Sequence, residues 1–214
     1  MTKQYTWARF SLLLPLALSA CISVGGGTKE SAANIYTLPS GSAGNARTPA
    51  PARGAAVVVA KPELPAGFDT ERIALYFEKE HRLDYYADAK WSARLDDLLQ
   101  DFVIQRAKQK LPGLAVGTAD IAPSARYRLA VKVTEFMPVY ADTPDKPPRL
   151  NVAIMVTVTA LPGGAVKTQV SMKKSAMASA NTLTIVTKEL GDLLQAATDE
   201  ALQKAAPSLS GGAS

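Results

Sequence analysis

The chain has 214 residues, of which 24 are Lys or Arg and 19 are Asp or Glu, with a single Cys and a single His. One Cys excludes an intramolecular disulfide and a cysteine-rich metal site, and one His excludes a multi-histidine cluster, so the composition predicts no metal and no cofactor. With 47% hydrophobic and 20% charged residues, the chain has the composition of a folded domain.

Residues 1–20 have the pattern of a secretory signal peptide. Lys3 and Arg9 form a positive start, and an apolar stretch follows at residues 10–18, interrupted only by a serine and a proline. A membrane span needs roughly 20 apolar residues, so this stretch is too short to remain in the bilayer. We expect it to be removed.

The segment ends in Leu18-Ser19-Ala20-Cys21, which resembles the lipobox of bacterial lipoproteins. We expect cleavage between Ala20 and Cys21 and acylation of Cys21, for example with palmitate; an ordinary signal peptide with an incidental Cys is the alternative. Two or three acyl chains anchor a protein stably, whereas one does not. Residue 22 is Ile rather than the Asp of inner-membrane retention. This predicts an outer-membrane anchor in a diderm bacterium, with the protein facing the periplasm.

Removal of the signal leaves a nearly neutral chain. The loss of Lys3 and Arg9 leaves 22 basic against 19 acidic residues. The bases are scattered, and Lys173-Lys174 is the one tight pair in the expected sheet. We therefore expect no nucleic-acid partner.

A tether is expected between the anchor and the folded body. Residues 21–54 are rich in Gly, Ser, Pro and Ala, which is typical of a flexible linker. Within them, residues 35–39 are β-prone and predict a short strand. The folded domain is expected at 55–206, with a disordered tail at 207–214.

The body begins with two β-rich segments. A continuous apolar run at 56–60 is typical of a strand buried on both faces. Residues 72–77 and 82–86 then predict a hairpin, with the polar residues 78–81 as its loop.

Two amphipathic helices are expected. Asp88 is a good N-cap for the first, which Trp91 opens and Pro112 ends. The second spans roughly residues 182–206, with Asn181 as a candidate cap. The apolar stripes consist of Trp91, Leu95, Leu98, Leu99, Phe102, Val103 and Ala107 in the first helix, and of Leu183, Val186, Leu190, Leu193, Leu194, Ala197 and Ala201 in the second.

Three segments between the helices alternate apolar and polar residues, as strands with one buried face do. They lie at 127–133, 150–158 and 166–173, and Pro162-Gly163-Gly164 is a good turn signal between the last two. The chain therefore predicts an α+β fold: a single layered domain with a mostly antiparallel sheet and two long amphipathic helices packed on it.

No catalytic constellation is visible, so the sequence predicts that the protein is not an enzyme and has no catalytic residues. His81 is the one imidazole and lies in a charged loop, without a nucleophile motif around it. Asp96 and Asp97 are adjacent on a helix, and we expect them to point in different directions rather than to form an acid/base pair. The run Gly25-Gly26-Gly27 lacks the features of a phosphate-binding loop.

Tyr85, Tyr86 and Trp91 form the most prominent aromatic cluster. Trp91 lies on the apolar stripe, so we expect it in the core. Adjacent tyrosines on a strand face opposite sides, so one can be buried while the other is exposed. Exposed aromatic side chains are enriched at interfaces. Tyr85 and Tyr86 are therefore the candidate partner contacts.

Taken together, these features resemble a known family, the ABC-type transport auxiliary lipoproteins. The likeness covers about residues 34–205 and is most specific at the start of the hairpin. It rests on the lipobox at 18–21, Tyr36-Thr37-Leu38, the stretch 68–100 with Arg72-Ile73, Leu83-Asp84-Tyr85-Tyr86 and Trp91, and the final order of three strands and a helix.

The resemblance implies a periplasm-facing lipoprotein that docks an MCE-type ABC transporter, whose permease and ATPase are other chains. Such systems move phospholipids or other hydrophobic molecules between the two membranes. The family has no catalytic residues to carry over. Two alternatives remain: a lipoprotein that scaffolds or activates another envelope machine, such as a peptidoglycan synthase, and a soluble lipid carrier with a deep apolar cavity. The sequence leaves homo-oligomer formation open.

Overall fold

A computed structural model of the chain describes residues 33–39, 56–121 and 124–209. The expected signal peptide at 1–20, the acylation site at Cys21 and the linker at 40–54 lie outside these ranges, so they remain predictions. None of the helices among the described residues is long and apolar enough to cross a membrane.

The described residues form one eight-stranded sheet and two helices, which confirms the α+β fold. The strands are β1 (Asn34–Tyr36), β2 (Ala56–Val59), β3 (Arg72–Phe77), β4 (Arg82–Trp91), β5 (Ala115–Gly117), β6 (Tyr127–Tyr140), β7 (Arg149–Ala160) and β8 (Val166–Met177). The two helices are α1 (Leu95–Lys110) and α2 (Leu183–Ala205). A 3-10 turn, η1 (Ala206–Leu209), follows α2 directly.

Strand β6 lies at the centre of the sheet. One of its sides pairs antiparallel with β7 from Tyr127 to Val139, and β7 pairs antiparallel with β8. Its other side pairs parallel with β2 near its start and with β3 at its end. The sheet is therefore mixed: its long ladders are antiparallel, as expected, whereas β1–β4, β2–β5, β2–β6 and β3–β6 are short parallel ones.

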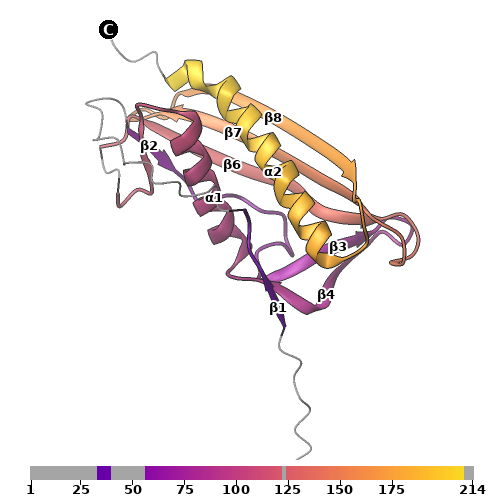
Figure 1. The fold of residues 1–214 in the computed structure, drawn as a ribbon. Coiled ribbons are helices and arrows are strands. Elements are labelled where there is room, and N and C mark those ends of the chain that lie inside the picture. The colour runs from indigo at the N-terminus through magenta and orange to yellow at the C-terminus, as the bar shows by residue number, and fades with distance from the viewer. Residues whose placement is uncertain (1–32, 40–55, 122–123, 210–214) are drawn as a thin grey trace, which may run out of the picture. The chain divides into compact units, whose positions relative to one another are not determined.

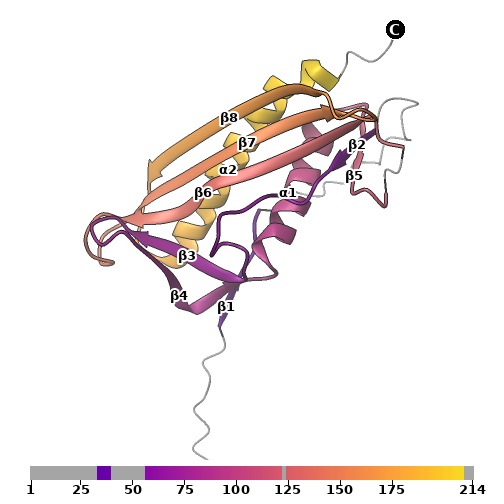
Figure 2. The same ribbon diagram turned by 180° about the vertical axis from the view of Figure 1, so that it is seen from behind.

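Both helices cover the same face of the sheet (Figures 1 and 2). The side chains that β7 directs to this face, such as Leu150, Val152 and Val156, have no exposed surface. Against them α2 packs Leu190 and Leu194, which are almost fully buried. The alternation read from the sequence is thus the alternation between a buried and an open sheet face.

A buried ion pair joins the two helices. The Arg106 guanidinium of α1 donates two hydrogen bonds to the Asp199 carboxylate of α2, one of them 2.7 Å long from Nε to Oδ1. The Arg106 side chain is only 8% exposed. Lys110 of α1 also lies 3.3 Å from the Asp199 carboxylate, so two cations of α1 share one carboxylate of α2.

The first helix begins later than the sequence suggests. Asp88 and Trp91 belong to β4, and α1 begins only at Leu95. The cause is long-range pairing: β1 pairs in parallel with residues 89–91, and the Trp91 N–H donates to the Glu71 carbonyl 2.7 Å away. Trp91 is 2% exposed and packs against Phe136, so its expected place in the core is confirmed.

Other differences are smaller. Asn181 does not cap α2, whose N-cap is Thr182. Strand β2 buries only Val57 and Val59 completely, so one of its faces rather than both is in the core. Residues 207–209 belong to the tail that we expected to be disordered at 207–214, but they lie in η1, and Leu209 is buried. Strand β5 is short and has no counterpart among the expected elements.

The segment after β1 is fixed to α2 by a close contact. Leu38 is 4% exposed, and Pro39 lies directly over Gly191 of α2. A Cβ atom at Gly191 would approach the Pro39 Cδ atom to 2.7 Å. The glycine therefore provides the space in which the N-terminal segment crosses the helix.

We predict that Gly191→Ala destabilises the protein although it improves helix propensity. The clash with Pro39 costs about 1–3 kcal/mol, whereas alanine in a helix gains about 1 kcal/mol, so the free energy of unfolding should fall by roughly 1 kcal/mol. In a Pro39→Ala background the clash is absent, and the same substitution should instead stabilise. Urea unfolding followed by circular dichroism measures both changes. Destabilisation of equal size in both backgrounds would contradict the contact.

Candidate docking site

The two tyrosines singled out from the sequence line a surface hollow of about 330 Å³. We call it the tyrosine hollow. It lies where the β3–β4 hairpin, the end of β6 and the residues before α2 meet. Its lining residues are Leu75, Phe77, Asp84, Tyr85, Tyr86, Ala87, Tyr140, Pro144 and Asn181.

A chain of hydrogen bonds crosses one side of the tyrosine hollow. The Tyr140 hydroxyl donates to Asn181 Oδ1 at 2.9 Å, so its oxygen accepts a hydrogen bond from the Tyr86 hydroxyl, 2.8 Å away. The Asn181 amide donates in turn to the Pro144 carbonyl. Burial raises the pKa of both phenols above its ordinary value. The chain ties β4, β6, the β6–β7 loop and the start of α2 together.

Tyr85 is held by a different set of contacts. Its hydroxyl donates to the Gly67 carbonyl at 2.8 Å, and the Arg72 guanidinium lies 3.9 Å from the centre of its ring. Gly67 has a φ of +88°, and a Cβ atom there would lie 3.0 Å from Leu83 Cδ2 and 3.1 Å from the Tyr85 hydroxyl. Glycine is therefore required for the loop to reach the ring.

Both tyrosines are half-buried, so the expected division into one core and one exposed ring is wrong. Each hydroxyl is already used within the chain. What the tyrosine hollow offers to a partner is ring surface next to aliphatic surface, with fixed side-chain positions.

Charged pairs stabilise the rim of the tyrosine hollow. The β3–β4 turn is linked to the β6–β7 loop by Lys79 and Asp142, 3.2 Å apart, and to β7 by Glu78 and Arg149, 3.0 Å apart. Asp84 accepts hydrogen bonds from the Tyr85 backbone N–H and from an Arg82 guanidinium N–H, which hold the pKa of Asp84 below its ordinary value. Exposed pairs such as these contribute little stability singly, but together they restrict the loops.

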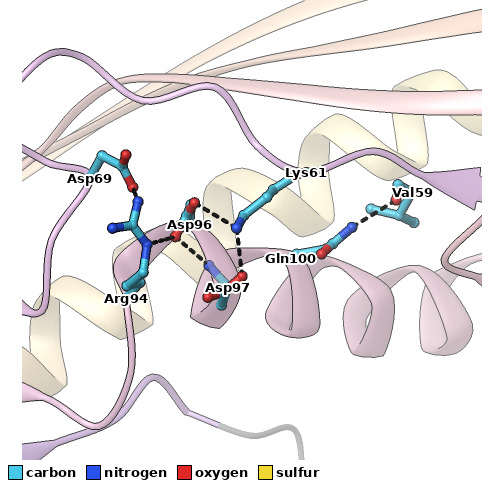
Figure 3. Close-up of polar contacts among 7 residues, drawn as sticks. All are labelled: Val59, Lys61, Asp69, Arg94, Asp96, Asp97 and Gln100. Carbon is cyan, nitrogen blue, oxygen red and sulfur yellow. Dashed lines mark hydrogen bonds and ion pairs between the residues drawn. The ribbon is translucent and has the colours of Figure 1, made fainter.

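A second group of polar residues surrounds the start of α1 (Figure 3). Asp96 and Asp97, which we expected to point in different directions, share one cation: Lys61 Nζ lies 2.8 Å from each carboxylate. Burial disfavours the ionised form of Asp96, but the hydrogen bond and charge of Lys61 outweigh it, so the pKa of Asp96 is lowered. Arg94, directly before α1, pairs with Asp69, which lies in the same β2–β3 loop as Lys61.

These contacts explain the position of the loop between β2 and β3. Gln100 donates to the Val59 carbonyl at 3.1 Å, one turn further along α1 (Figure 3). Acidic side chains in the first turn also interact favourably with the helix dipole. Every carboxylate of the group is engaged by a neighbouring cation, so the group holds the loop on the helix.

His81 lies at the exposed turn of the β3–β4 hairpin, as expected. Its φ is +51°, and its Nδ1 atom is 3.3 Å from the Tyr76 hydroxyl. Across the part of the chain that the structure describes, no group of three His, Cys, Asp or Glu side chains is arranged to hold a metal ion.

Sequence reasoning found Tyr85 and Tyr86 but missed the residues that complete the tyrosine hollow. No sequence motif marks Tyr140, and Asn181 is only a candidate helix cap by its position. Their contacts join residues 41 to 54 positions apart. No local pattern in the sequence encodes such pairs. The one available signal for this site was Asn181, a polar residue directly before a strong helix pattern.

Comparison with known proteins gives a family and a fold. Residues 36–202 match the family model of the ABC-type transport auxiliary lipoprotein component. The crystal structure of protein XCC0632 from Xanthomonas campestris, of the DUF330 family, is similar with a TM-score of 0.64 and 22% identity, over 82% of this chain and 96% of that one. A crystal structure of an uncharacterized protein has a TM-score of 0.62 and 14% identity, over 83% and 99%. Among curated proteins, no sequence matches.

We predict that Tyr140→Phe destabilises the protein more than Tyr86→Phe. The first variant removes the middle of the hydrogen-bond chain and leaves Asn181 Oδ1 and the Tyr86 hydroxyl unpaired, at a cost of about 1–3 kcal/mol. The second removes one donor only, which should cost about 0.5–1.5 kcal/mol. Chemical unfolding of both variants measures the difference. Equal stabilities would show that the chain of hydrogen bonds does not hold the site together.

Proposed function

Because the chain belongs to the family of ABC-type transport auxiliary lipoprotein components, we propose that it docks an MCE-type ABC transporter at the outer membrane. The family's auxiliary part in transport implies a non-enzymatic protein. In this proposal the permease and the ATPase are separate chains, and the transported molecules are phospholipids or other hydrophobic compounds. The match over residues 36–202 is the observation that carries the proposal.

The lipobox at residues 18–21 supports the anchored position. After cleavage behind Ala20, acyl chains on Cys21 would hold the N-terminus in the membrane, and Ile22 favours the outer one. The chain from residue 22 to residue 33 then connects the anchor to β1, with a reach of about 20 Å if it behaves as a random coil. The periplasmic body would remain near the membrane and accessible to a transporter component.

The tyrosine hollow is the surface that we assign to the partner. Tyr85 and Tyr86 supply aromatic surface there, and aromatic residues are enriched in the centres of protein interfaces. Their hydroxyls and the surrounding loops are fixed by internal hydrogen bonds and ion pairs, so little side-chain freedom remains to be lost on binding. Exposed Ala87 leaves room beside the rings for a side chain of the partner.

Two hollows of the described residues, of about 330 and 360 Å³, are open surface features. A soluble lipid carrier would need a deep apolar cavity between sheet and helices. In the described body that space is filled by tightly buried side chains, such as Leu129, Leu150 and Leu202, each without exposed surface. The geometry thus favours a docking protein over a carrier.

We predict that Cys21→Ser abolishes membrane anchoring. Without the thiol, no acyl chain is attached, so the protein should lose palmitate labelling and leave the outer-membrane fraction. Metabolic labelling with palmitate and membrane fractionation measure both effects. Continued labelling together with unchanged fractionation would contradict the anchor.

We predict that Ala87→Arg weakens capture of the transporter. An arginine at residue 87 places a long charged side chain in the tyrosine hollow, which should reduce retention of the detergent-solubilised MCE protein by about tenfold or more, equivalent to about 1.4 kcal/mol. The test is affinity purification of the full lipidated chain from cells that also produce an MCE-domain protein.

Ala196→Arg is the matched control, because Ala196 is exposed on α2 and does not line the tyrosine hollow. This variant should retain the partner as the unchanged chain does. Retention by Ala87→Arg as well would exclude the tyrosine hollow as the contact. If the unchanged chain retains no MCE protein, or retains a peptidoglycan synthase instead, the transporter assignment itself fails.

A further inference from the structure

Strand β8 ends the sheet with a long open edge. It extends from Val166 to Met177 and, among the described strands, pairs with β7 alone. Figures 1 and 2 show it at the border of the sheet, beside α2. The N–H and C=O groups on its outer side therefore form a template on which a further strand can pair.

Two of the three lysines of β8, Lys173 and Lys174, do not guard this edge, whereas the third, Lys167, is exposed near its start. Proteins commonly protect edge strands with charged side chains, especially lysine. Here Lys173 reaches back over the open sheet face to Glu135 on β6, 2.6 Å away, and Lys174 reaches back over the other face to Glu200 on α2, also 2.6 Å away. Each of these two ammonium groups is therefore paired with a carboxylate of the same chain, one on β6 and one on α2.

Apolar surface marks both ends of the strand. Val166 and Met177 are each 64% exposed, and they are two of the five large apolar residues that the described structure exposes. An antiparallel neighbour with the same sequence would bring the start of one strand next to the end of the other. It would therefore cover Val166 and Met177 in both copies.

We propose that β8 pairs antiparallel with β8 of a second copy of this chain, about a two-fold axis at Ser171. Such an interface is self-complementary, because each strand presents the same surface to the other. In this register Val170 lies opposite Met172 on the helix-covered face, and Gln169 lies opposite Lys173 on the open face. The two sheets then continue into one.

The positions of the lysines select this register. An axis at Val170 would place Lys173 opposite Lys167, and an axis at Lys173 would place that lysine opposite its own copy; like charges directly opposite are destabilising. An axis at Met172 would leave the two copies of Lys173 as diagonal neighbours, about 7–8 Å apart. The axis at Ser171 separates the two copies of Lys173 by four positions along the strands. It also keeps nearly all of β8 paired.

A cysteine at residue 171 of the full chain tests the pairing in its own membrane. In Ser171→Cys the two thiols lie directly opposite, with Cβ atoms about 4.5–5.5 Å apart, close to the separation that a disulfide requires. In Ser175→Cys, on the same face of the same strand, the thiols are about 26 Å apart, eight residues at about 3.3 Å each. Ser171→Cys should give a reducible dimer on a non-reducing gel, at least about tenfold more abundant than Ser175→Cys gives.

A second measurement does not depend on a disulfide. Sedimentation in density-matched detergent should give the mass of two chains for the unchanged protein and for Thr157→Lys, and of one chain for Ser171→Lys. Both variants add one lysine to the open sheet face, but residue 157 lies on β7, one strand in from the edge. Equal cross-linking of the two cysteine variants, one chain for the unchanged protein, or two chains for Ser171→Lys would overturn the proposal.

Discussion

The two-sided pairing of β6 is the constraint on which the rest of the structure depends. One side of β6 carries the antiparallel ladder with β7 along almost its whole length, and the other side holds β2 at its start and β3 at its end. A bulge between Val133 and Glu135 lies between these two parallel partners. Bulges bend a strand and increase its twist, so one strand can serve both partners. The β3–β4 hairpin is thereby fixed at the end of β6.

The tyrosine hollow follows from this arrangement. Tyr140 is the last residue of β6, and the pairing of Phe77 with Tyr140 brings β3 and β4 alongside it. Tyr86 and Asn181 then both form hydrogen bonds with the Tyr140 hydroxyl. Three hydrogen bonds thus connect three segments that are distant in sequence: β4, the end of β6 with its following loop, and the residues before α2. The result is an aromatic surface whose side-chain positions are set by contacts within the chain.

The two surfaces that we propose for interactions share no residue. The tyrosine hollow involves β3, β4 and the end of β6, whereas the open edge belongs to β8, two strands beyond β6 in the pairing order. A second copy at β8 therefore does not use the side chains that a transporter component would contact. An anchored pair would offer two tyrosine hollows to one transporter assembly, and two linked sites bind more tightly than one without any new contact.

The sequence alone determined whatever depends on local pattern. The period-2 alternation identified β6, β7 and β8, and the 3.6-residue stripes identified both helices, because each pattern reports one buried face. The lipobox is also local, and Cys21 rests on the sequence entirely. Only tertiary structure decided the pairing of β1 with residues 89–91, which kept Trp91 in a strand, and the contacts of Tyr86, Tyr140 and Asn181. These join segments that meet only when the sheet is complete, so no spacing in the sequence encodes them.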